Sequence, residues 1–193
     1  MLLNRDKIIG LLEEFGELLK QRGGSVIINI YGGAAMAILY SDGRMSEDID
    51  VMLGSDNYFE FKEARGLIAE KYGLRENWIN DAVAGAIAFD MKSSDLINFG
   101  VFGNLYINIV SAEQLLAMKL FSSRDDKDFE DAVLLAEQLG LYKKKDFNGL
   151  LRRYFKDNSV NQRNKSKNHY NGINDFIKNL VNKLNQKSGV NGR

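Results

Sequence analysis

The sequence has 193 residues, of which 45% are hydrophobic, and it contains no cysteine and no proline. A chain of this length can bury one good-sized core, and the absence of cysteine excludes disulfides, thiolate metal sites and cysteine nucleophiles. The formal net charge is zero, but residues 1–142 carry 13 Lys/Arg against 23 Asp/Glu, whereas residues 143–193 carry 13 against 3. We therefore expect one domain over 1–142, followed by a basic helical or flexible appendage over 143–193.

The chain becomes charged within its first residues, and no apolar run approaches the roughly 18 residues that a membrane span requires. We expect a soluble, cytoplasmic protein with no membrane partner. The basic appendage favours contact with a polyanion, because Lys and Arg displace condensed counterions from phosphates. The alternative is that it folds back onto the acidic domain.

The predicted elements alternate between helices and strands. Residues 4–22 form an amphipathic pattern that begins at an Asn4 cap and ends at Gly23-Gly24. The later elements are strand 26–31, a helix from Gly32, strand 48–53, helix 56–72, a short strand at 78–81, a hairpin of 96–102 with 106–110, and helices 112–121 and 126–139. Residues 82–88 are ambiguous. A polar linker over 157–168 precedes apolar residues at helical spacing over 173–184, and the class is α/β or α+β.

Two carboxylates stand one residue apart in the apolar strand, at Asp48 and Asp50. Side chains alternate across a strand, so these two point to one side while Ile49 and Val51 point to the other. Two neighbouring carboxylates repel, and a divalent cation between them keeps both ionised. The spacing predicts a Mg²⁺ site, against the alternative of two solvated loop aspartates.

A glycine turn precedes this strand in the chain. Strand 26–31 runs into Gly32-Gly33, and a helix begins at once. Glycine lets the backbone approach a phosphate closely, and a helix start offers free N–H donors. We therefore expect Gly32 and Gly33 to contact a nucleotide phosphate.

The run from Tyr31 to Ala35, followed by Arg44, Ser46 and Asp48-Ile49-Asp50, resembles the signature of the nucleotidyltransferase superfamily of DNA polymerase beta type. It is most similar to the minimal bacterial nucleotidyltransferases of abortive-infection and toxin–antitoxin modules. A second block, with Lys119 and the acidic stretch Arg124 to Asp131, is similar to a further segment of those proteins. Gly33 departs from the pattern, because many superfamily members have a serine there.

The resemblance implies an α/β (α+β) fold, with a nucleotidyltransferase-like mixed sheet flanked by helices. It also implies two Mg²⁺ ions held by Asp48 and Asp50, with an NTP as substrate. Arg44 and Ser46 brace the metal strand or touch phosphate, and Lys119 meets the triphosphate or reaches solvent. Asp128 and Asp131 hold Lys119 or Arg124, or are simply solvated.

A third carboxylate usually completes such a metal site, and Asp81, Asp90 and Asp95 are the candidates. Asp81 is favoured, because it ends a short strand that suits a place beside strand 48–53; the alternative role is a helix cap. His169, the sole histidine, lies in the polar linker and is expected to be solvated.

The leading hypothesis is a Mg²⁺-dependent enzyme that moves a nucleoside monophosphate from an NTP to an acceptor hydroxyl. The resemblance implies RNA, at the tRNA 3′ end, or a protein as acceptor, and a toxin with a cognate antitoxin as the setting. One alternative is an antibiotic-type transferase that acts on a small molecule. The other is a degenerate, non-enzymatic fold that binds nucleic acid or a partner.

Overall fold

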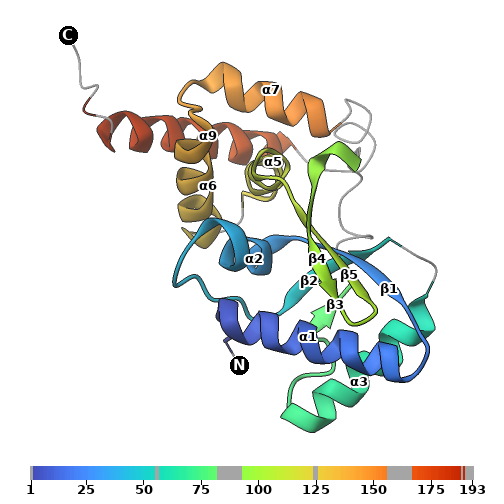
Figure 1. Cartoon of the computed structure of the whole chain (residues 1–193). Coiled ribbons are helices and arrows are strands. Elements are labelled where there is room, and N and C mark those ends of the chain that lie inside the picture. Colours follow the sequence, from blue (N-terminus) through green and yellow to red (C-terminus); the bar gives the residue numbers. More distant parts are fainter. Residues whose placement is uncertain are drawn as a thin grey trace. The chain divides into compact units, whose positions relative to one another are not determined.

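The computed structural model describes residues 2–54, 57–81, 93–123, 126–155, 167–187 and 189. The chain divides into two compact units (Figure 1). Unit 1 comprises Met1–Ile87 and Leu96–Val110, and unit 2 comprises Ala88–Asp95 and Ser111–Arg193. The predicted boundary at residue 142 falls within unit 2 and stays a prediction. The ambiguous segment 82–88 and most of the predicted linker lie outside the described residues.

Unit 1 is built on a mixed sheet, as the sequence predicts. Its strands lie in the order β3-β2-β1-β5-β4, with β1/β5 and β2/β3 parallel and β1/β2 and β4/β5 antiparallel. The elements are α1 (Arg5–Gln21), β1 (Val26–Ile30), α2 (Gly32–Ala35), the π-helical turn η1 (Met36–Tyr40), β2 (Ile49–Leu53), α3 (Tyr58–Tyr72), β3 (Ile79–Asn80), β4 (Leu96–Phe102) and β5 (Leu105–Val110).

Local signals explain where several of these elements begin and end. The Asn4 side chain accepts a hydrogen bond from the Lys7 N–H at 3.0 Å and caps α1, which confirms the predicted helix start. The predicted hairpin is also present, and Gly103 at its turn has a φ of 52°. Glycine adopts this left-handed backbone at little cost, so the chain can reverse between β4 and β5.

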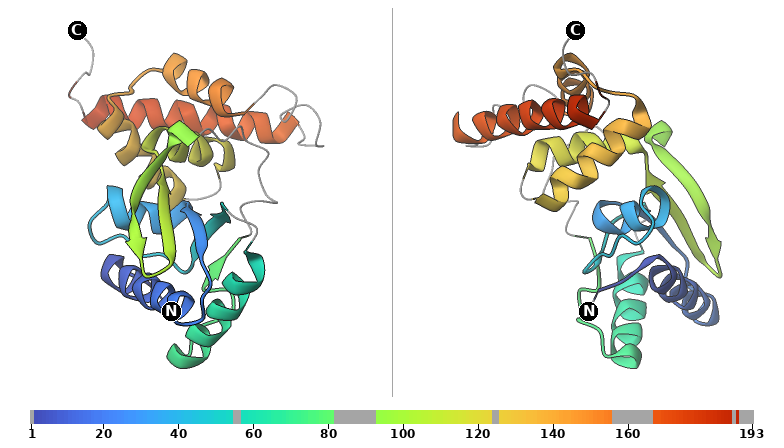
Figure 2. Two further views of the ribbon diagram at one scale, coloured as in Figure 1. Left: turned by 45° about the vertical axis from the view of Figure 1, so that its right-hand side comes forward. Right: turned by 90° about the vertical axis from the view of Figure 1, so that its left-hand side faces the viewer.

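The core of unit 1 lies between the sheet and two helices that contact each other, α1 and α3 (Figure 2). Phe15 of α1 packs against Phe61 of α3, with ring centroids 5.7 Å apart, and against Trp78. Two ion pairs also join this helical region, one between Arg22 and Glu63 and one between Lys71 and Glu14. These contacts hold α1 and α3 together, and α1 also contacts β4 and β5 of the sheet.

Unit 2 is helical in the part that the structure describes. Its elements are the 3₁₀ turn η2 (Ser93–Asp95), α5 (Ala112–Ser122), α6 (Asp126–Leu139), α7 (Lys144–Tyr154) and α9 (Lys167–Lys187). Helix α5 is central: residues 114–121 are all buried, and α6, α7 and α9 each contact it. Ser111 accepts a hydrogen bond from the Gln114 N–H and caps α5, as its sequence predicts.

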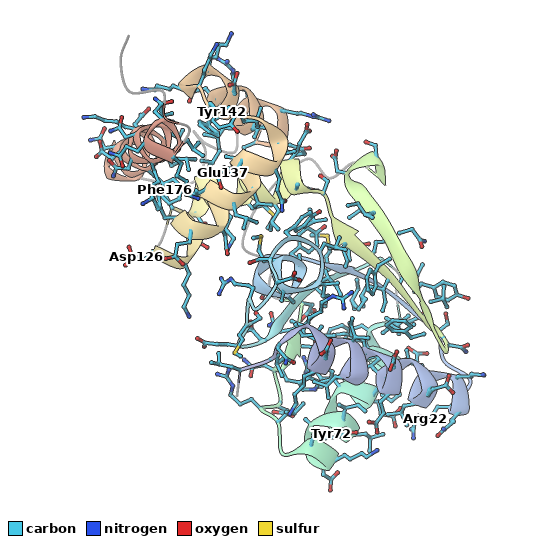
Figure 3. All side chains as sticks on the ribbon, turned by 60° about the vertical axis from the view of Figure 1, so that its left-hand side comes forward. Arg22, Tyr72, Asp126, Glu137, Tyr142 and Phe176 are labelled. Atoms are coloured by element: carbon cyan, nitrogen blue, oxygen red, sulfur yellow. The ribbon has the colours of Figure 1, made fainter. Side chains whose placement is uncertain are left out.

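The C-terminal helix α9 packs on its own unit. Ile173, Ile177, Leu180 and Leu184 are buried, and Phe176 meets Phe129 of α6 edge to face (Figure 3). The predicted helix at 173–184 is therefore confirmed, within a longer span. Helix α7 has no counterpart among the predicted elements. No helix within the described ranges is both long and apolar enough to cross a bilayer.

Candidate functional site

Strand β2 carries the predicted carboxylate pair beside the end of β1. The two strands run antiparallel, with Ile30 opposite Val51, and the Tyr31 N–H donates to the Asp50 carbonyl at 2.9 Å. Ile49 and Val51 are fully buried, whereas Asp48 and Asp50 are half-buried. The alternation predicted from the sequence is therefore present, and it places Asp50 next to the glycine turn.

Gly32 approaches the Asp50 side chain directly. Its φ is 62°, and a Cβ on Gly32 would lie 2.5 Å from Asp50 Oδ2. No side chain fits in that gap, and the left-handed backbone is a second reason why glycine is required. The turn therefore lies against a carboxylate oxygen of the predicted metal strand.

Gly33 makes a similar approach to Ser46. A Cβ on Gly33 would lie 2.6 Å from the Ser46 hydroxyl oxygen. Ser46 is itself fixed, because its backbone N–H and carbonyl pair with Leu3 at 2.9 and 2.7 Å. Arg44 lies two residues earlier and donates to the Met45 carbonyl. The structure thus brings Gly32, Gly33, Ser46 and Asp50 together; their contacts with a nucleotide stay predictions.

Asn80 is a site residue that the sequence analysis missed. Strand β3 pairs with β2 in parallel, as predicted, and the register sets Asn80 opposite Asp50. The Asn80 amide also donates to Asp48 Oδ2 at 3.4 Å, so one amide lies beside both carboxylates. The signal was present in the sequence as an amide one residue before Asp81, but only the register reveals its partner.

Burial raises the pKa of Asp48 above its ordinary value. The nearby Arg75 and the Asn80 hydrogen bond lower this pKa, and neighbouring Glu47 raises it, but desolvation is the largest cause. The Arg75 guanidinium itself donates to the Glu47 carbonyl at 3.2 Å. Asp48 is therefore a carboxylate whose charged form would gain from a further cation.

Asp81 follows Asn80 at the end of β3. The strand ends at Asn80, which is paired with Asp50, so the pairing of β2 with β3 does not include Asp81. Within the described ranges, no three His, Cys, Asp or Glu side chains come close enough to hold a metal ion together. The structure thus does not bring Asp81 into a triad with Asp48 and Asp50, and its catalytic role stays a prediction.

Further polar side chains share this face of the sheet. Asn29 stands opposite Met52, two residues from Asp50, and it is 3% exposed. Asn108 on β5 is the register partner of Asn29 and donates to its side-chain oxygen at 2.9 Å. The opposite face carries the buried Ile28 and Ile30. One face is therefore apolar and packed, and the other carries carboxylates and amides.

Comparison with known proteins places this chain in a family. The family model described as "Nucleotidyltransferase of unknown function (DUF6036)" matches residues 6–183. The chain belongs to this nucleotidyltransferase family. The match spans both units, and it agrees with the resemblance drawn from the glycine turn and the Asp-x-Asp strand. No curated protein and no solved structure gives a significant match.

In this family member, unit 2 holds a second charged cluster. Lys119 of α5 is 7% exposed, and its ammonium contacts Asp128 Oδ1 at 2.6 Å and Asp131 Oδ2 at 2.8 Å. Ser122 donates to the other oxygen of Asp128 at 2.8 Å. The predicted partnership of Asp128 and Asp131 with Lys119 is therefore present. Whether Lys119 meets a triphosphate stays a prediction, and Arg124 lies outside the described residues.

Of the other two third-carboxylate candidates, Asp95 is the one that the structure describes. Asp95 belongs to unit 2, where it is buried, accepts from the Tyr154 hydroxyl at 3.3 Å and lies 3.7 Å from the Arg153 guanidinium. Burial also raises the pKa of Tyr154 to about 12. Asp90 and the side chain of His169 lie outside the described part of the chain.

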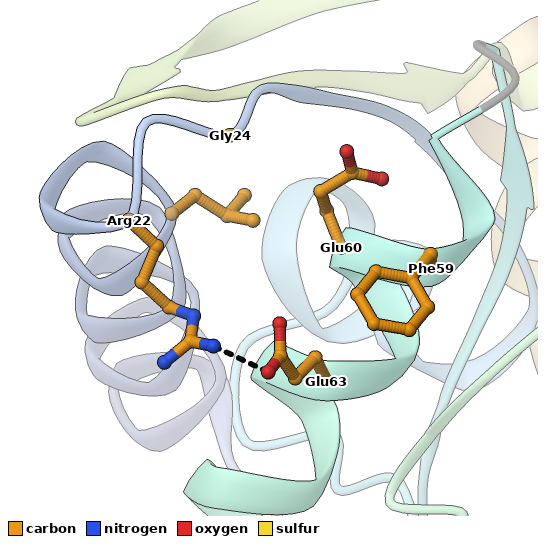
Figure 4. A pocket seen from close by; sticks show the side chains of 6 residues that line it. Arg22, Gly24, Phe59, Glu60 and Glu63 are labelled. Atoms are coloured by element: carbon orange, nitrogen blue, oxygen red, sulfur yellow. Dashed lines mark hydrogen bonds and ion pairs between the residues drawn. The ribbon is translucent and has the colours of Figure 1, made fainter.

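A cavity of about 370 Å³ lies between α1 and α3 (Figure 4). Its lining contains none of the predicted site residues: Leu19, Arg22, Gly24, Phe59, Glu60 and Glu63. Arg22, the cationic side chain of this lining, is paired with Glu63. The cavity is thus separate from the carboxylate face and offers no uncompensated positive charge to a phosphate.

Proposed function

We propose that this family member is a Mg²⁺-dependent nucleotidyltransferase that moves a nucleoside monophosphate from an NTP to a hydroxyl of RNA, with the tRNA 3′ end as the acceptor position. The observation that carries this proposal is the contact of Gly32 with the Asp50 carboxylate, beside Asp48. A glycine turn that can cradle phosphate and a carboxylate pair that can hold a cation then meet at one place.

The donor set fits a Mg²⁺ ion. Mg²⁺ is commonly bound through one or two carboxylates, with waters and substrate phosphates completing its octahedron. Asp48 and Asp50 supply two carboxylates on one strand face, and the Asn80 amide lies beside both. The raised pKa of Asp48 reflects burial that a bound cation would offset. When bound, the metal would neutralise triphosphate charge and favour the ionised acceptor hydroxyl.

The reaction exchanges one phosphorus–oxygen bond for another. The acceptor oxygen attacks the α-phosphorus of the NTP, the bond from that phosphorus to the β-phosphate bridge breaks, and pyrophosphate leaves. The hydroxyl proton passes to a carboxylate or to water. In this scheme Asp48 and Asp50 would hold the cation, and the Gly32-Gly33 backbone would offer N–H donors to the phosphates.

The test is a transfer assay with each of the four α-labelled NTPs, Mg²⁺, total RNA and lysate protein, with RNA, protein and small molecules resolved separately. Asp48→Asn and Asp50→Asn are compared with Asp42→Asn, an exposed carboxylate in the preceding loop. We expect label in RNA with the wild type and with Asp42→Asn, and a loss of about 10²–10³-fold in the other two variants.

Other outcomes of this assay overturn the proposal in part or in full. Label that appears in protein or in small molecules alone would overturn the RNA acceptor while keeping the transfer. Full activity in Asp48→Asn or Asp50→Asn would overturn the assigned site. No label in any fraction with any NTP would favour a non-enzymatic fold.

A further inference from the structure

Helices α7 and α9 of unit 2 are neighbours (Figures 1 and 2). Positive charge is concentrated on these two helices. Residues 143–155 and 171–187 carry eight Lys or Arg against two Asp. Arg153 is paired with Glu113, and Lys187 with Glu137. The remaining six make no ion pair with any residue that the structure describes: Lys143, Lys144, Lys145, Arg152, Lys178 and Lys183.

The packing of α9 directs this charge outward. Its apolar residues are buried within unit 2, as described above, whereas Lys178 and Lys183 are exposed. On α7, Phe147 and Leu150 are buried while Lys144 and Arg152 are exposed. Both helices therefore use an apolar stripe for packing and present cations to solvent.

A groove of about 270 Å³ lies among these cations. It is lined by Lys144 of α7 and by five residues of α9: Asn174, Asp175, Lys178, Val181 and Asn182. The two ammonium groups come from different helices, and the Asn182 amide adds a neutral donor. Asp175 is the single carboxylate of the lining, so the cations outnumber it.

We propose that this groove binds the phosphate backbone of RNA, with Lys144 and Lys178 each contacting a phosphate; the inference rests on the proposed RNA acceptor. Lys144 and Arg152 are eight residues apart on α7, which spans about 12 Å at 1.5 Å per residue. Arg152 lies outside the lining of the groove, so the exposed cations of α7 extend beyond it, which suits a chain of phosphates better than a single phosphate. Lysine and arginine at such a surface gain affinity by releasing counterions, without reading sequence.

The test measures binding of labelled total tRNA as a function of salt, without NTP and with EDTA present. Lys144→Gln/Lys178→Gln is compared with Lys20→Gln/Lys62→Gln, which removes two exposed lysines of unit 1. We expect weaker binding only in the first variant. Its slope of log affinity against log salt should also fall by about 0.7–0.9 for each lost contact.

Transfer activity is measured on the same proteins, so that the two proposals fail separately. An unchanged salt slope in Lys144→Gln/Lys178→Gln, with transfer to RNA intact, overturns the groove and leaves the enzyme. A reduced slope without transfer in any protein supports the groove and overturns the proposed reaction. Binding of polyglutamate through the two lysines as tightly as RNA would overturn RNA in favour of an acidic protein partner.

Discussion

Two pairs of aspartates in this protein differ in what surrounds them. Asp128 and Asp131 are buried around the ammonium of Lys119, at 2.6 and 2.8 Å, and Ser122 satisfies a further oxygen. Asp48 is half-buried beside the Asn80 amide, and its pKa is raised by desolvation, while Asp50 lies against a glycine backbone.

The difference separates an internal ion pair from a site that suits an external cation. A buried carboxylate keeps its charge at low cost only where a cation accompanies it. The chain supplies that cation to Asp128 and Asp131 from α5. For Asp48, Arg75 acts from nearby, but burial still dominates its pKa. We therefore propose that Asp128 and Asp131 hold Lys119 in place, and that Asp48 and Asp50 bind the metal.

The largest effect is expected from removing the internal cation. Lys119→Met leaves two buried aspartates without their ammonium, which should cost about 3–5 kcal/mol of unfolding free energy. Urea denaturation measures this loss. Lys119→Met/Asp128→Asn/Asp131→Asn is the matched control and should recover much of the stability. If Lys119→Met is as stable as the wild type, the cluster is not an internal ion pair.

An intermediate effect is expected from Gly32→Ala. Its positive φ should cost about 1–3 kcal/mol, and the new methyl would lie against Asp50 Oδ2 and displace it. Gly43→Ala is the control, because Gly43 has a φ of 77° and a methyl added there would meet no atom within 4 Å. Both should lose stability, but only Gly32→Ala should lose transfer activity, by about 10²-fold. Equal activity in the two variants would remove Gly32 from the site.

The smallest effect is expected from Asp48→Asn in the metal-free protein. Because the folded pKa of Asp48 is raised above its ordinary value, stability from this group is full below the unfolded pKa and is lost as pH rises through the folded pKa. The asparagine amide of the Asp48→Asn variant does not ionise, so the variant does not lose this stability. Thermal melts in EDTA should thus show Asp48→Asn slightly more stable at neutral pH, with the gain vanishing at about pH 3. A variant that is less stable at neutral pH would contradict the assigned burial cost.

The sequence predicted the elements whose signals are local. The Asn4 cap, the hairpin turn at Gly103 and the Ser111 cap each act within a few residues, so the sequence alone locates them. The partnership of Lys119 with Asp128 and Asp131 was also accessible, because the two aspartates are one helical turn apart.

Long-range pairing is what the sequence could not supply. The contact between Gly32 and Asp50 depends on the antiparallel register of β1 and β2. The position of Asn80 beside the two carboxylates depends on the pairing of β2 with β3, a strand of only two residues. A shift of one residue in the pairing of β2 with β3 would place Asp81, instead of Asn80, beside the carboxylates. Helix α7 was not predicted, because its many cations make the apolar stripe that contains Phe147 and Leu150 hard to recognise in the sequence.

The central claim is tested most directly by binding of fluorescent NTPs with Mg²⁺ and with EDTA, expressed as the ratio of the two affinities. For the wild type and Asp128→Asn we predict that Mg²⁺ strengthens binding of at least one NTP. For Asp50→Asn we predict a ratio close to one. A ratio well above one in Asp50→Asn, or a ratio close to one in a folded Asp128→Asn, would contradict the division between the two aspartate pairs.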